Sequence, residues 1–584
     1  MSQVLIIGSG ISGLTCAIEN ASRGNHVILV SPFPSERSQS VLAAGGINAV
    51  LNKGGGDGGG NGGADSNSGA GGSFGADGDS IDKHIEDTLK GGCYIAGKRA
   101  VSGLCHAAPD IVNWLGSLGT VFTRDSDGSI SKRAFGGQSF PRTHYAGTAT
   151  GKQIVTALVM EARRYEGLGL IERRFWTDFY AGLIKDGICY GAMLYNEATR
   201  SVEAVTADAV VIATGGMNAL FGKTTGSTQC DGYVAGKLFE QGAELKNLEF
   251  IQYHPTTIVT DQKKILVSEA ARGEGGRLFY EQDGKRVYFM EDIYGPNGNL
   301  MPRDIVSKCI YETGRQVYLD VSFLGRDKII SRIPEVYDLC RKYKNLDISR
   351  DPVPVVPSVH FFMGGLAVGL HHRTNIKNLY AVGECASMYH GANRLGGNSL
   401  LAAIYSGRVA AEDIDKNCGG SGGSGNSGVS GGSQPSSPVS GSPDWSAEIR
   451  EANEMLIQKR NSQSKFPAMY VRGMLADAVN ASLGIVRDKD TLENGISDID
   501  YYLGIAGKIN YDRSELEYFN YSLWSILTLA KATLVSAASR CESRGAHLRK
   551  DFPATSDNYK AATVISYDGG RFTTRLTGED DYEG

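Results

Sequence analysis

The sequence has no closely spaced cysteines, although it contains ten of them in 584 residues. No two form a C-x-x-C pair, whereas zinc sites and iron–sulfur clusters held by one chain use short cysteine spacings. The sequence therefore predicts no metal site. Scattered cysteines in a large chain are typical of a reducing compartment, where the thiol serves as a small core side chain, so we expect a cytoplasmic protein.

Long apolar runs are also missing, since no stretch reaches the length of about 18 residues that a membrane-spanning helix needs. The N-terminus, MSQVLIIGSG, lacks the basic segment of a secretion signal and becomes a glycine loop after one strand. We therefore expect the protein to reach the inner face of a membrane only indirectly, through partner subunits.

There is no excess of positive charge, because 59 lysines and arginines stand against 64 aspartates and glutamates. A dedicated nucleic-acid binder usually presents a basic face, so the sequence argues against nucleic acid as a partner. The hydrophobic content of 41% is ordinary for a soluble globular protein, and the length predicts about three or four domains.

Apolar side chains are nearly absent from two glycine-rich segments, residues 52–80 and 417–445. Such segments cannot offset the conformational entropy that ordering would remove, so we expect flexible surface loops. Two interpretations remain open for them: a plain insertion, or a tether or docking loop for a partner.

The first forty residues carry the pattern of a dinucleotide-binding βαβ unit. A continuous apolar run at residues 4–7 predicts a strand buried on both faces, helical spacing follows at 14–22, and residues 26–30 predict a second strand. Between the first strand and the helix stands a G-x-G-x-x-G motif formed by Gly8, Gly10 and Gly13. In this order the glycines allow the tight turn, the approach of a pyrophosphate and close helix–strand packing. The helix N-terminus then faces the phosphates.

Ser31 ends the second strand, where an acidic residue usually binds a ribose hydroxyl and where serine can still accept a hydrogen bond. Two later apolar strands end in ATGG (ADAVVIATGG, 207–216) and in VGE (NLYAVGECA, 378–386). Such strands accompany an N-terminal glycine motif in flavoproteins with two dinucleotide folds. The sequence therefore indicates FAD rather than NAD.

Six further motifs occur in order: EFIQYHPT (249–256), SEAARGEGG (268–276), PRDIVS (302–307), HFFMGG (360–365), HGANRLGGNSLL (390–401) and ESRGAH (542–547). Together they resemble the flavoprotein subunit of succinate dehydrogenase and fumarate reductase over nearly the whole chain. L-aspartate oxidase belongs to the same superfamily and is the main alternative. Ala-Ser would be expected there in place of Gly396-Gly397, so RLGGNSLL favours the succinate/fumarate branch.

The resemblance implies an α/β fold with a discontinuous, two-dinucleotide-binding (Rossmann-like) FAD domain. Its expected parts are the FAD domain at 1–240 (with the flexible loop 52–80) and 350–418, an inserted α+β capping domain at 241–349, a flexible linker at 419–443, and a mainly helical C-terminal domain at 444–584. Apolar residues recur every three to four positions in 521–540, which predicts a packed helix there.

The resemblance also implies a C4 dicarboxylate substrate, fumarate or succinate. A dianion needs cations and donors at both ends, and arginine presents a planar fork that matches a carboxylate. Matching the motifs residue by residue places the substrate among His254, Ser268, His360 and Arg394. Ser268 stands where the family usually has threonine and keeps the hydroxyl, so its role as a donor is expected to survive.

Interconversion of fumarate and succinate needs a hydride at one carbon, which the flavin handles, and a proton at the next. The resemblance assigns the proton to Arg303. Because the pKa of arginine lies above about 12, it can act as an acid only if Glu269 and Arg272 return its proton at once. A structural ion pair with Arg272 is the alternative role for Glu269, and a place in the core is the alternative for His254 and His360.

The expected FAD contacts are Gly8, Gly10, Gly13, Ser31, Arg37, Ser38, Gln39, Ala44, Gly45, Gly46, Asp231, Glu384, Ser399 and Leu400. Glu384 is expected to hold a ribose-type hydroxyl, and Ser399 and Leu400 to approach the ring through their backbone. The small residues of RSQSVLAAGGINAV (37–50) are expected to lie beside the flavin.

Gln39 departs from the family pattern. In the membrane-bound succinate/fumarate branch a histidine at the corresponding position bonds covalently to the flavin, and an amide cannot form that bond. We therefore expect dissociable FAD. The covalent bond would raise the flavin potential, so its absence favours fumarate reduction. L-aspartate oxidase, whose FAD is also unlinked, stays an alternative, as does a non-catalytic flavin-binding subunit.

Electrons must reach the flavin from another molecule, because the chain has no cluster-binding cysteines. The resemblance implies that the partner is an iron–sulfur electron-transfer subunit. Arg544 and His547 of ESRGAH are expected either beside the flavin or such a partner, or in a structural role. His371-His372 is expected in a solvated turn.

Overall fold

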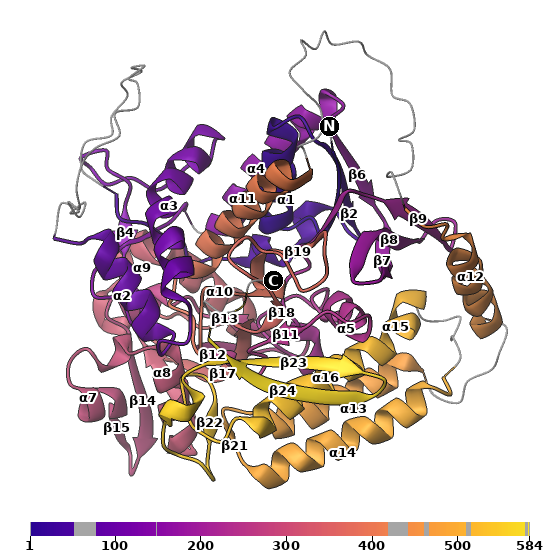
Figure 1. Ribbon diagram of the computed structural model, residues 1–584. Helices are drawn as coiled ribbons and strands as arrows, with labels where there is room; N and C mark the ends of the chain where they lie inside the picture. Colours follow the sequence, from indigo (N-terminus) through magenta and orange to yellow (C-terminus); the bar gives the residue numbers. More distant parts are fainter. Residues whose placement is uncertain are drawn as a thin grey trace.

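The computed structural model describes residues 2–51, 78–147, 149–418, 442–460, 467–509, 516–578 and 582 (Figure 1). The loop predicted at 52–80 and the linker predicted at 419–443 lie outside these ranges, apart from residues 78–80 and 442–443. None of the described helices is long and apolar enough to cross a membrane. No group of three or more His, Cys, Asp or Glu side chains in the described part could hold a metal ion.

A parallel sheet with the strand order β19-β10-β1-β2-β6 forms the first layer. Its strands are β1 (Gln3–Ile7), β2 (His26–Ser31), β6 (Ile171–Phe175), β10 (Ala209–Ile212) and β19 (Leu379–Ala381). Helix α1 (Ile11–Ser22) follows β1 directly and packs against α4 (Thr150–Gly167) and α11 (Asn398–Cys418). The predicted βαβ unit and α/β class are confirmed, and both later apolar strands join this sheet.

A second, antiparallel sheet has the order β13-β12-β17-β16-β14-β15. Its strands are β12 (Ile251–Val259), β13 (Lys264–Leu266), β14 (Arg277–Gln282), β15 (Lys285–Val287), β16 (Val317–Asp320) and β17 (Val353–Phe362). The intervening helices are α6 (Ala270–Gly273), α7 (Phe289–Tyr294), α8 (Arg303–Thr313), α9 (Arg326–Arg332) and α10 (Pro334–Lys344). Strand β17 pairs with β12 and β16, so this sheet extends beyond residue 349, where the predicted capping domain ended. Pairing between strands so distant in sequence leaves no local signal.

The C-terminal region begins as helices: α12 (Ser446–Arg460), α13 (Ala468–Ser482), α14 (Lys489–Ala506), α15 (Glu517–Tyr521) and α16 (Leu523–Ser539). The helix predicted at 521–540 corresponds to α16. The chain then forms a hairpin, β23 (Ala562–Asp568) and β24 (Arg571–Thr577). In a third sheet this hairpin joins β11 (Leu245–Lys246), β18 (Gly365–Ala367) and β20 (Ala386–Ser387). The C-terminal region is therefore helical first and shares a sheet with earlier parts of the chain afterwards.

Smaller elements complete the molecule. The strands are β3 (Ile47–Asn48), β4 (Lys132–Arg133), β5 (Thr143–His144), β7 (Thr177–Lys185), β8 (Ile188–Asn196), β9 (Ser201–Thr206), β21 (Val486–Arg487) and β22 (Leu548–Arg549). The helices are α2 (Ile81–Gly91), α3 (Lys98–Ser117) and α5 (Tyr233–Glu240).

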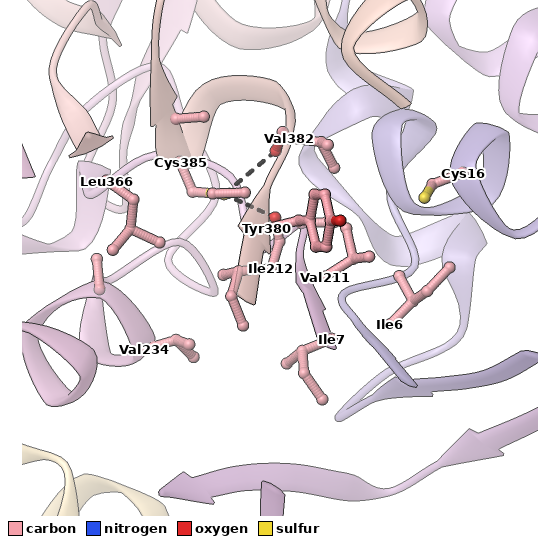
Figure 2. Close-up of a cluster of buried hydrophobic side chains, with 14 of the residues drawn as sticks. Ile6, Ile7, Cys16, Val211, Ile212, Val234, Leu366, Tyr380, Val382 and Cys385 are labelled. Carbon is pink, nitrogen blue, oxygen red and sulfur yellow. Dashed lines mark hydrogen bonds between the residues drawn. The ribbon is translucent and has the colours of Figure 1, made fainter. Parts of the chain in front are cut away.

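The main hydrophobic core surrounds the parallel sheet (Figure 2). Cysteines take part in it as small side chains: Cys16 is buried on α1, and the Cys385 thiol donates to the carbonyls of Ile212 and Val382 at 3.2 Å each. Burial raises the pKa of Cys16 to about 12 and that of Cys385 to about 11. These thiols stay protonated and unreactive, as expected for core residues.

The end of the first glycine-rich segment is ordered, contrary to prediction. Asp79 is buried and accepts two hydrogen bonds, at 2.8 and 2.9 Å, from the guanidinium of Arg142. The Ser80 hydroxyl accepts from the Lys83 N–H at 3.2 Å and caps α2. A charge pair with a distant arginine and a helix cap fix these two residues despite their glycine-rich surroundings.

His372 also differs from expectation, since only its neighbour is solvated. The His371 side chain is 67% exposed, whereas His372 is buried. The two ring nitrogens of His372 lie 2.8 Å from the Ala381 carbonyl and 2.5 Å from the Tyr389 hydroxyl. Burial lowers the pKa of His372 to about 4, so it is a neutral core histidine.

Candidate active site

A continuous cavity extends from the loop after β1 across the carboxyl ends of the parallel strands to the second sheet. This position, outside the carboxyl ends of the strands, is where open α/β sheets bind their ligands. The predicted site residues that line it are Gly8, Gly10, Ser31, Ser38, Gln39, Ala44, Gly45, Gly46, Asp231, His254, Ser268, Glu269, Arg303, His360, Glu384, Arg394, Ser399 and Leu400. Residues far apart in sequence therefore meet around one space.

Three predicted residues do not line the cavity. Gly13 faces β1, where a Cβ would lie 1.9 Å from the Gly8 carbonyl oxygen, so it serves helix–strand packing. Arg37 is exposed on the outer side of the loop. Arg272 lies behind Glu269, in contact with its carboxylate.

The glycine loop has the geometry that a dinucleotide requires. Gly8 has a φ of +113°, and a Cβ there would lie 2.3 Å from the Ala213 carbonyl oxygen, so no other residue fits. A Cβ on Gly10 would come within 3.3 Å of the Ser40 hydroxyl, at the wall of the cavity. The N-terminus of α1 opens at this point, which suits a pyrophosphate. The residues present therefore fit the expected dinucleotide cofactor.

Gln39 connects the predicted flavin-facing loop to the segment around Ser227, next to the cavity-lining residues Thr225 and Gly226. Its side-chain oxygen accepts a hydrogen bond from the Ser227 N–H at 2.8 Å, and Gln39 itself lines the cavity. The neighbouring glycines have packing roles that the sequence did not indicate. A Cβ on Gly46, whose φ is +145°, would lie 2.4 Å from the His144 carbonyl oxygen, because β3 pairs with β5 there. On Gly45 it would lie 3.2 Å from Phe135.

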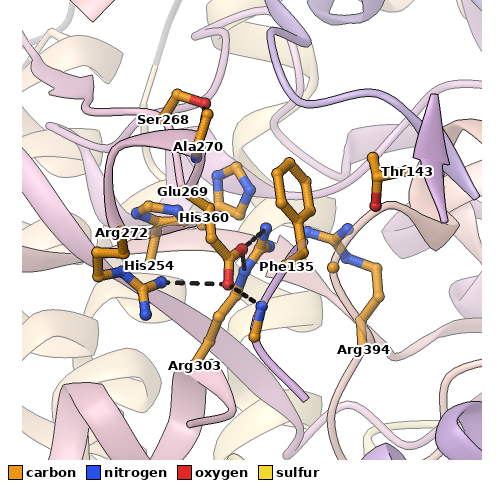
Figure 3. A network of polar contacts seen from close by, with 12 residues as sticks. Phe135, Thr143, His254, Ser268, Glu269, Ala270, Arg272, Arg303, His360 and Arg394 are labelled. Carbon is orange, nitrogen blue, oxygen red and sulfur yellow. Dashed lines mark hydrogen bonds and ion pairs between the residues drawn. The ribbon is translucent and has the colours of Figure 1, made fainter. Parts of the chain in front are cut away.

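Three charged side chains form a buried row at the second sheet, and Figure 3 shows the Glu269 carboxylate between Arg272 and Arg303. Arg303 donates through Nε and Nη2 to the same oxygen of Glu269, at 2.9 and 2.7 Å. The other Glu269 oxygen lies 3.2 Å from Nη2 of Arg272 and accepts from the Gly136 N–H at 2.8 Å. Arg303 lies at the start of α8 and its side chain is only 7% exposed.

The carboxylate of Glu269 stays ionised in this row. Burial alone would raise its pKa, but the charges of Arg303 and Arg272, with hydrogen bonds from Arg303 and the Gly136 N–H, outweigh that effect and lower the pKa to about 2. Burial lowers the pKa of Arg272. The row therefore holds two cations that share one anion: Arg303 is hydrogen-bonded to Glu269, and Arg272 forms an ion pair with it.

Two histidines and an arginine complete the cavity wall. The rings of His254 and His360 meet edge to face with centroids 5.1 Å apart, and His360 Nδ1 lies 2.9 Å from the Thr225 hydroxyl. Burial, then the charge of Arg303, lowers the pKa of both histidines well below the usual value, so both rings are neutral. The guanidinium carbon of Arg394 lies 4.2 Å from the ring centroid of Phe361. His254 Nε2 and Arg394 Nε are buried and have no hydrogen-bond partner within the described part of the chain.

Two residues of this site escaped the sequence reasoning. The side-chain oxygen of Gln252 accepts from Arg303 at 2.9 Å and from Arg394 at 3.0 Å, so it sets the distance between the two guanidinium groups. Its place two residues before His254 on a strand could have revealed it, since such residues share a face. Phe135 lines the cavity from a loop far away in sequence, for which no local signal exists.

Two further predicted FAD contacts also line the cavity: Glu384, expected to hold a ribose-type hydroxyl, and Asp231. Glu384 accepts from the Phe362 N–H at 3.1 Å, and burial raises its pKa to about 7. Asp231 accepts from the Tyr518 hydroxyl at 2.8 and 2.9 Å and from Arg472 at 3.2 Å. Tyr518 also lines the cavity, so the C-terminal region helps to build it.

Arg544 and His547 lie outside the cavity. His547 is fully buried, 2.9 Å from a guanidinium nitrogen of Arg487, and Arg544 pairs with Glu542 at 2.7 Å. Of the two roles expected for ESRGAH, the structural one matches these contacts.

Comparisons with known proteins match both the N-terminal and the C-terminal parts of the chain. The FAD binding domain family matches residues 3–400, and the fumarate reductase flavoprotein C-terminal family matches residues 472–580. The succinate dehydrogenase flavoprotein subunit of Bacillus subtilis is 34% identical over 97% of this chain and 94% of its own length. A chain of the fumarate reductase (CoM/CoB) of Methanothermobacter marburgensis is 33% identical over 96% of each of the two proteins.

Solved structures share the fold over the full length. A variant of the E. coli quinol fumarate reductase protein FrdA matches with a TM-score of 0.82 and 26% identity, over 99% of this chain and 97% of that one.

An L-aspartate oxidase of Nicotiana tabacum is also similar in sequence, with 28% identity over 96% of this chain and 82% of its own length. With a family match over residues 3–400 and relatives above 30% identity along nearly the whole chain, the protein is an FAD-dependent oxidoreductase that belongs to the family of succinate dehydrogenase and fumarate reductase flavoprotein subunits.

Proposed function

We propose that the protein interconverts fumarate and succinate as the flavoprotein subunit of a larger enzyme, with fumarate reduction as its favoured direction. The observation that carries this proposal is the set of Arg303, Arg394 and two neutral histidines on a cavity that also includes the glycine loop.

The cavity holds FAD in this proposal. The glycine loop would take the pyrophosphate, Glu384 and Asp231 would hold hydroxyl groups, and the residues from Gln39 to Gly46 would lie beside the ring system. Bound FAD supplies or accepts a hydride at its N5 atom.

A C4 dicarboxylate would bind between the ring-facing loop and the second sheet. Arg394, with its unpartnered Nε, would take one carboxylate in a charge-assisted hydrogen bond. His254 has an unpartnered Nε2, and Ser268 a hydroxyl at the cavity wall, so both are placed to bind substrate oxygens. Cationic and polar donors at the carboxylates draw charge from the double bond, which makes hydride attack easier.

Arg303 delivers the proton in this proposal. Its side chain lines the cavity and is hydrogen-bonded to Glu269. As Arg303 gives a proton to the substrate carbon, Arg272 passes one through Glu269 to restore it, so the missing proton is then at Arg272, where it must be replaced from outside the row. The low pKa of Glu269 fits this role, because the carboxylate is ready to accept a proton and releases it quickly.

The state of the two histidines sets an expected pH dependence. Since the pKa values of His254 and His360 lie well below 6.5, both rings stay neutral from pH 8 to pH 6. The value of kcat/KM for fumarate is therefore expected to show no acid limb from them in this range. A limb near pH 6.5 that disappears in His360→Asn would contradict this expectation. A limb near pH 7 that persists in His360→Asn would point to Glu384 instead, whose pKa is about 7.

Gln39 leads to the expectation that FAD is bound without a covalent link. An amide is not a nucleophile at neutral pH, and the Gln39 side-chain oxygen is already bonded to the Ser227 N–H. Acid precipitation is therefore expected to release all flavin into the supernatant, as measured by absorbance near 450 nm. Flavin that stays on the denatured polypeptide, visible as fluorescence of the protein band in a gel, would refute the expectation. Without the link, the lower potential favours giving electrons to fumarate.

One set of assays tests the proposed function against its alternatives. The purified protein should reduce fumarate with reduced viologen faster than it oxidises succinate with a dye. Formation of iminoaspartate from L-aspartate would favour L-aspartate oxidase instead, and absence of all three activities with FAD bound would favour a non-catalytic flavin protein. For electron supply we propose an iron–sulfur partner subunit. Co-purification with a cysteine-rich protein would support it, and full activity of the isolated chain with a soluble physiological donor would refute it.

A further inference from the structure

A second cavity, of about 570 Å³, lies in the capping region at the outer end of the row of charges. Arg272 lines this cavity, whereas its ion-pair partner Glu269 lines the first one. The contact of 3.2 Å between these two side chains therefore joins the two cavities. The remaining lining residues come from 273–277 and 291–300, and several of them are exposed.

Arg272 is held so that part of its guanidinium group stays available to this cavity. Its side chain is fully buried, and Nη1 donates to the Asn299 carbonyl at 2.6 Å. Its Nε and Nη2, in contrast, have no hydrogen-bond partner within the described residues, although Nη2 lies at the ion-pair distance of 3.2 Å from Glu269. A buried N–H without a partner beside a cavity of this size is a place where water binds, because leaving the N–H unsatisfied is costly.

Glu291 supplies a carboxylate on the same cavity wall. Its Oε1 accepts from the Asn299 side-chain amide at 2.9 Å and from Arg277 Nε at 2.7 Å. The Asn299 side chain is fixed in turn, since its oxygen accepts from the Leu278 N–H at 2.9 Å. Glu291 is 18% exposed, so it reaches solvent on one side and the cavity on the other. Asn299 thus connects Glu291 and Arg272 through its side chain and its carbonyl.

We propose that this second cavity is the solvent inlet of the proton relay, and that the Glu291 carboxylate passes protons from solvent to water next to Arg272. The proposal rests on the proposed function, in which each fumarate takes one hydride and one proton. Arg303 gives the proton to carbon, Arg272 refills it through Glu269, and solvent refills Arg272 through the inlet. One proton enters for each one consumed, and no further reactant is needed.

The inlet acts only after the first turnover, which provides its test. In protein that has been reduced beforehand, Arg303 already carries the first proton, so the first reduction of fumarate in Glu291→Gln is expected to match the wild type. Steady-state turnover is expected to fall about ten-fold, with a larger solvent deuterium isotope effect, since refilling then limits the rate. Glu281→Gln, on the exposed end of β14 and away from the cavity, is the matched control and is expected to behave as the wild type.

A second variant covers the case in which Glu291→Gln weakens the fold by freeing Arg277. Asn297 lines the inlet cavity, is exposed and touches none of the relay side chains. Asn297→Phe would fill the cavity and is expected to show the same split between first and later turnovers. Wild-type steady-state rates in both variants would overturn the inlet while leaving the proposed function intact. Failure of the wild type to reduce fumarate would overturn the proposed function, and the inlet with it.

Discussion

Replacing Arg303 with glutamine is expected to lower kcat for fumarate reduction by about 10³-fold or more, because general acid catalysis by a positioned group contributes about 10²–10⁴-fold. Glutamine can still donate one hydrogen bond to Glu269 or Gln252, but it carries no proton that it can deliver. The change also leaves the Glu269 carboxylate with Arg272 as its ion-pair partner, in a place where burial opposes ionisation. Proton transfer and part of the electrostatic stabilisation are therefore lost together.

The measurement is the fumarate reduction rate of purified Arg303→Gln with reduced viologen, together with its flavin content and absorption spectrum. Lys308→Gln is the matched control, since Lys308 lies on the same helix with a side chain that is 47% exposed. Flavin content is expected to be normal in both variants. Turnover retained in Arg303→Gln would remove Arg303 as the proton donor and would strengthen the non-catalytic interpretation of the chain.

Much of the fold could be predicted because its signals are local. The continuous apolar strand at residues 4–7, the glycine motif and the helical spacing at 521–540 each depend on neighbours in sequence, and each corresponds to an observed element. The contributions of β17 to the second sheet and of the C-terminal hairpin to the third depend on partners far away in the chain. No window of sequence contains such pairs, so propensity and periodicity cannot reveal them.

In the candidate site, too, residues in local motifs could be predicted, whereas contacts between distant residues could not. His254, Glu269, Arg303 and Arg394 stand in motifs that could be matched by eye, and the structure places all four on one cavity. The geometry between them is set by Gln252, which holds the two arginines, and by backbone groups such as the Gly136 N–H. These groups act through distance and direction, which composition does not encode. Arg37 illustrates the reverse case, a motif member whose side chain points to solvent.

Gly397→Ser is the second change expected to have a large effect, and it bears on the choice between the two enzyme classes. Gly397 has a φ of +86°, and a Cβ there would lie 2.0 Å from the side-chain oxygen of Asn48. Asn48 cannot move freely, because its amide donates to the Gly396 carbonyl at 2.8 Å and to Asn398 at 2.7 Å. Its oxygen accepts from Thr143 at 2.6 Å. The serine would therefore strain the backbone and break a buried network beneath the cavity wall.

The two costs add, since a side chain at positive φ costs about 1–3 kcal/mol and a broken buried hydrogen bond about 1–3 kcal/mol. We expect Gly397→Ser to lose most of its FAD on purification and to unfold at a clearly lower temperature, as measured by the flavin-to-protein ratio and by thermal unfolding of the holoprotein. Gly473→Ser is the control, because Gly473 lies in α13 at ordinary helical φ with open space around its Cβ position. Serine is the better helix former of the two, so this control is expected to be neutral or slightly stabilising. If Gly397→Ser instead binds FAD as tightly as the wild type, the fold does not require the glycine pair, and RLGGNSLL no longer favours the succinate/fumarate branch over L-aspartate oxidase on physical grounds.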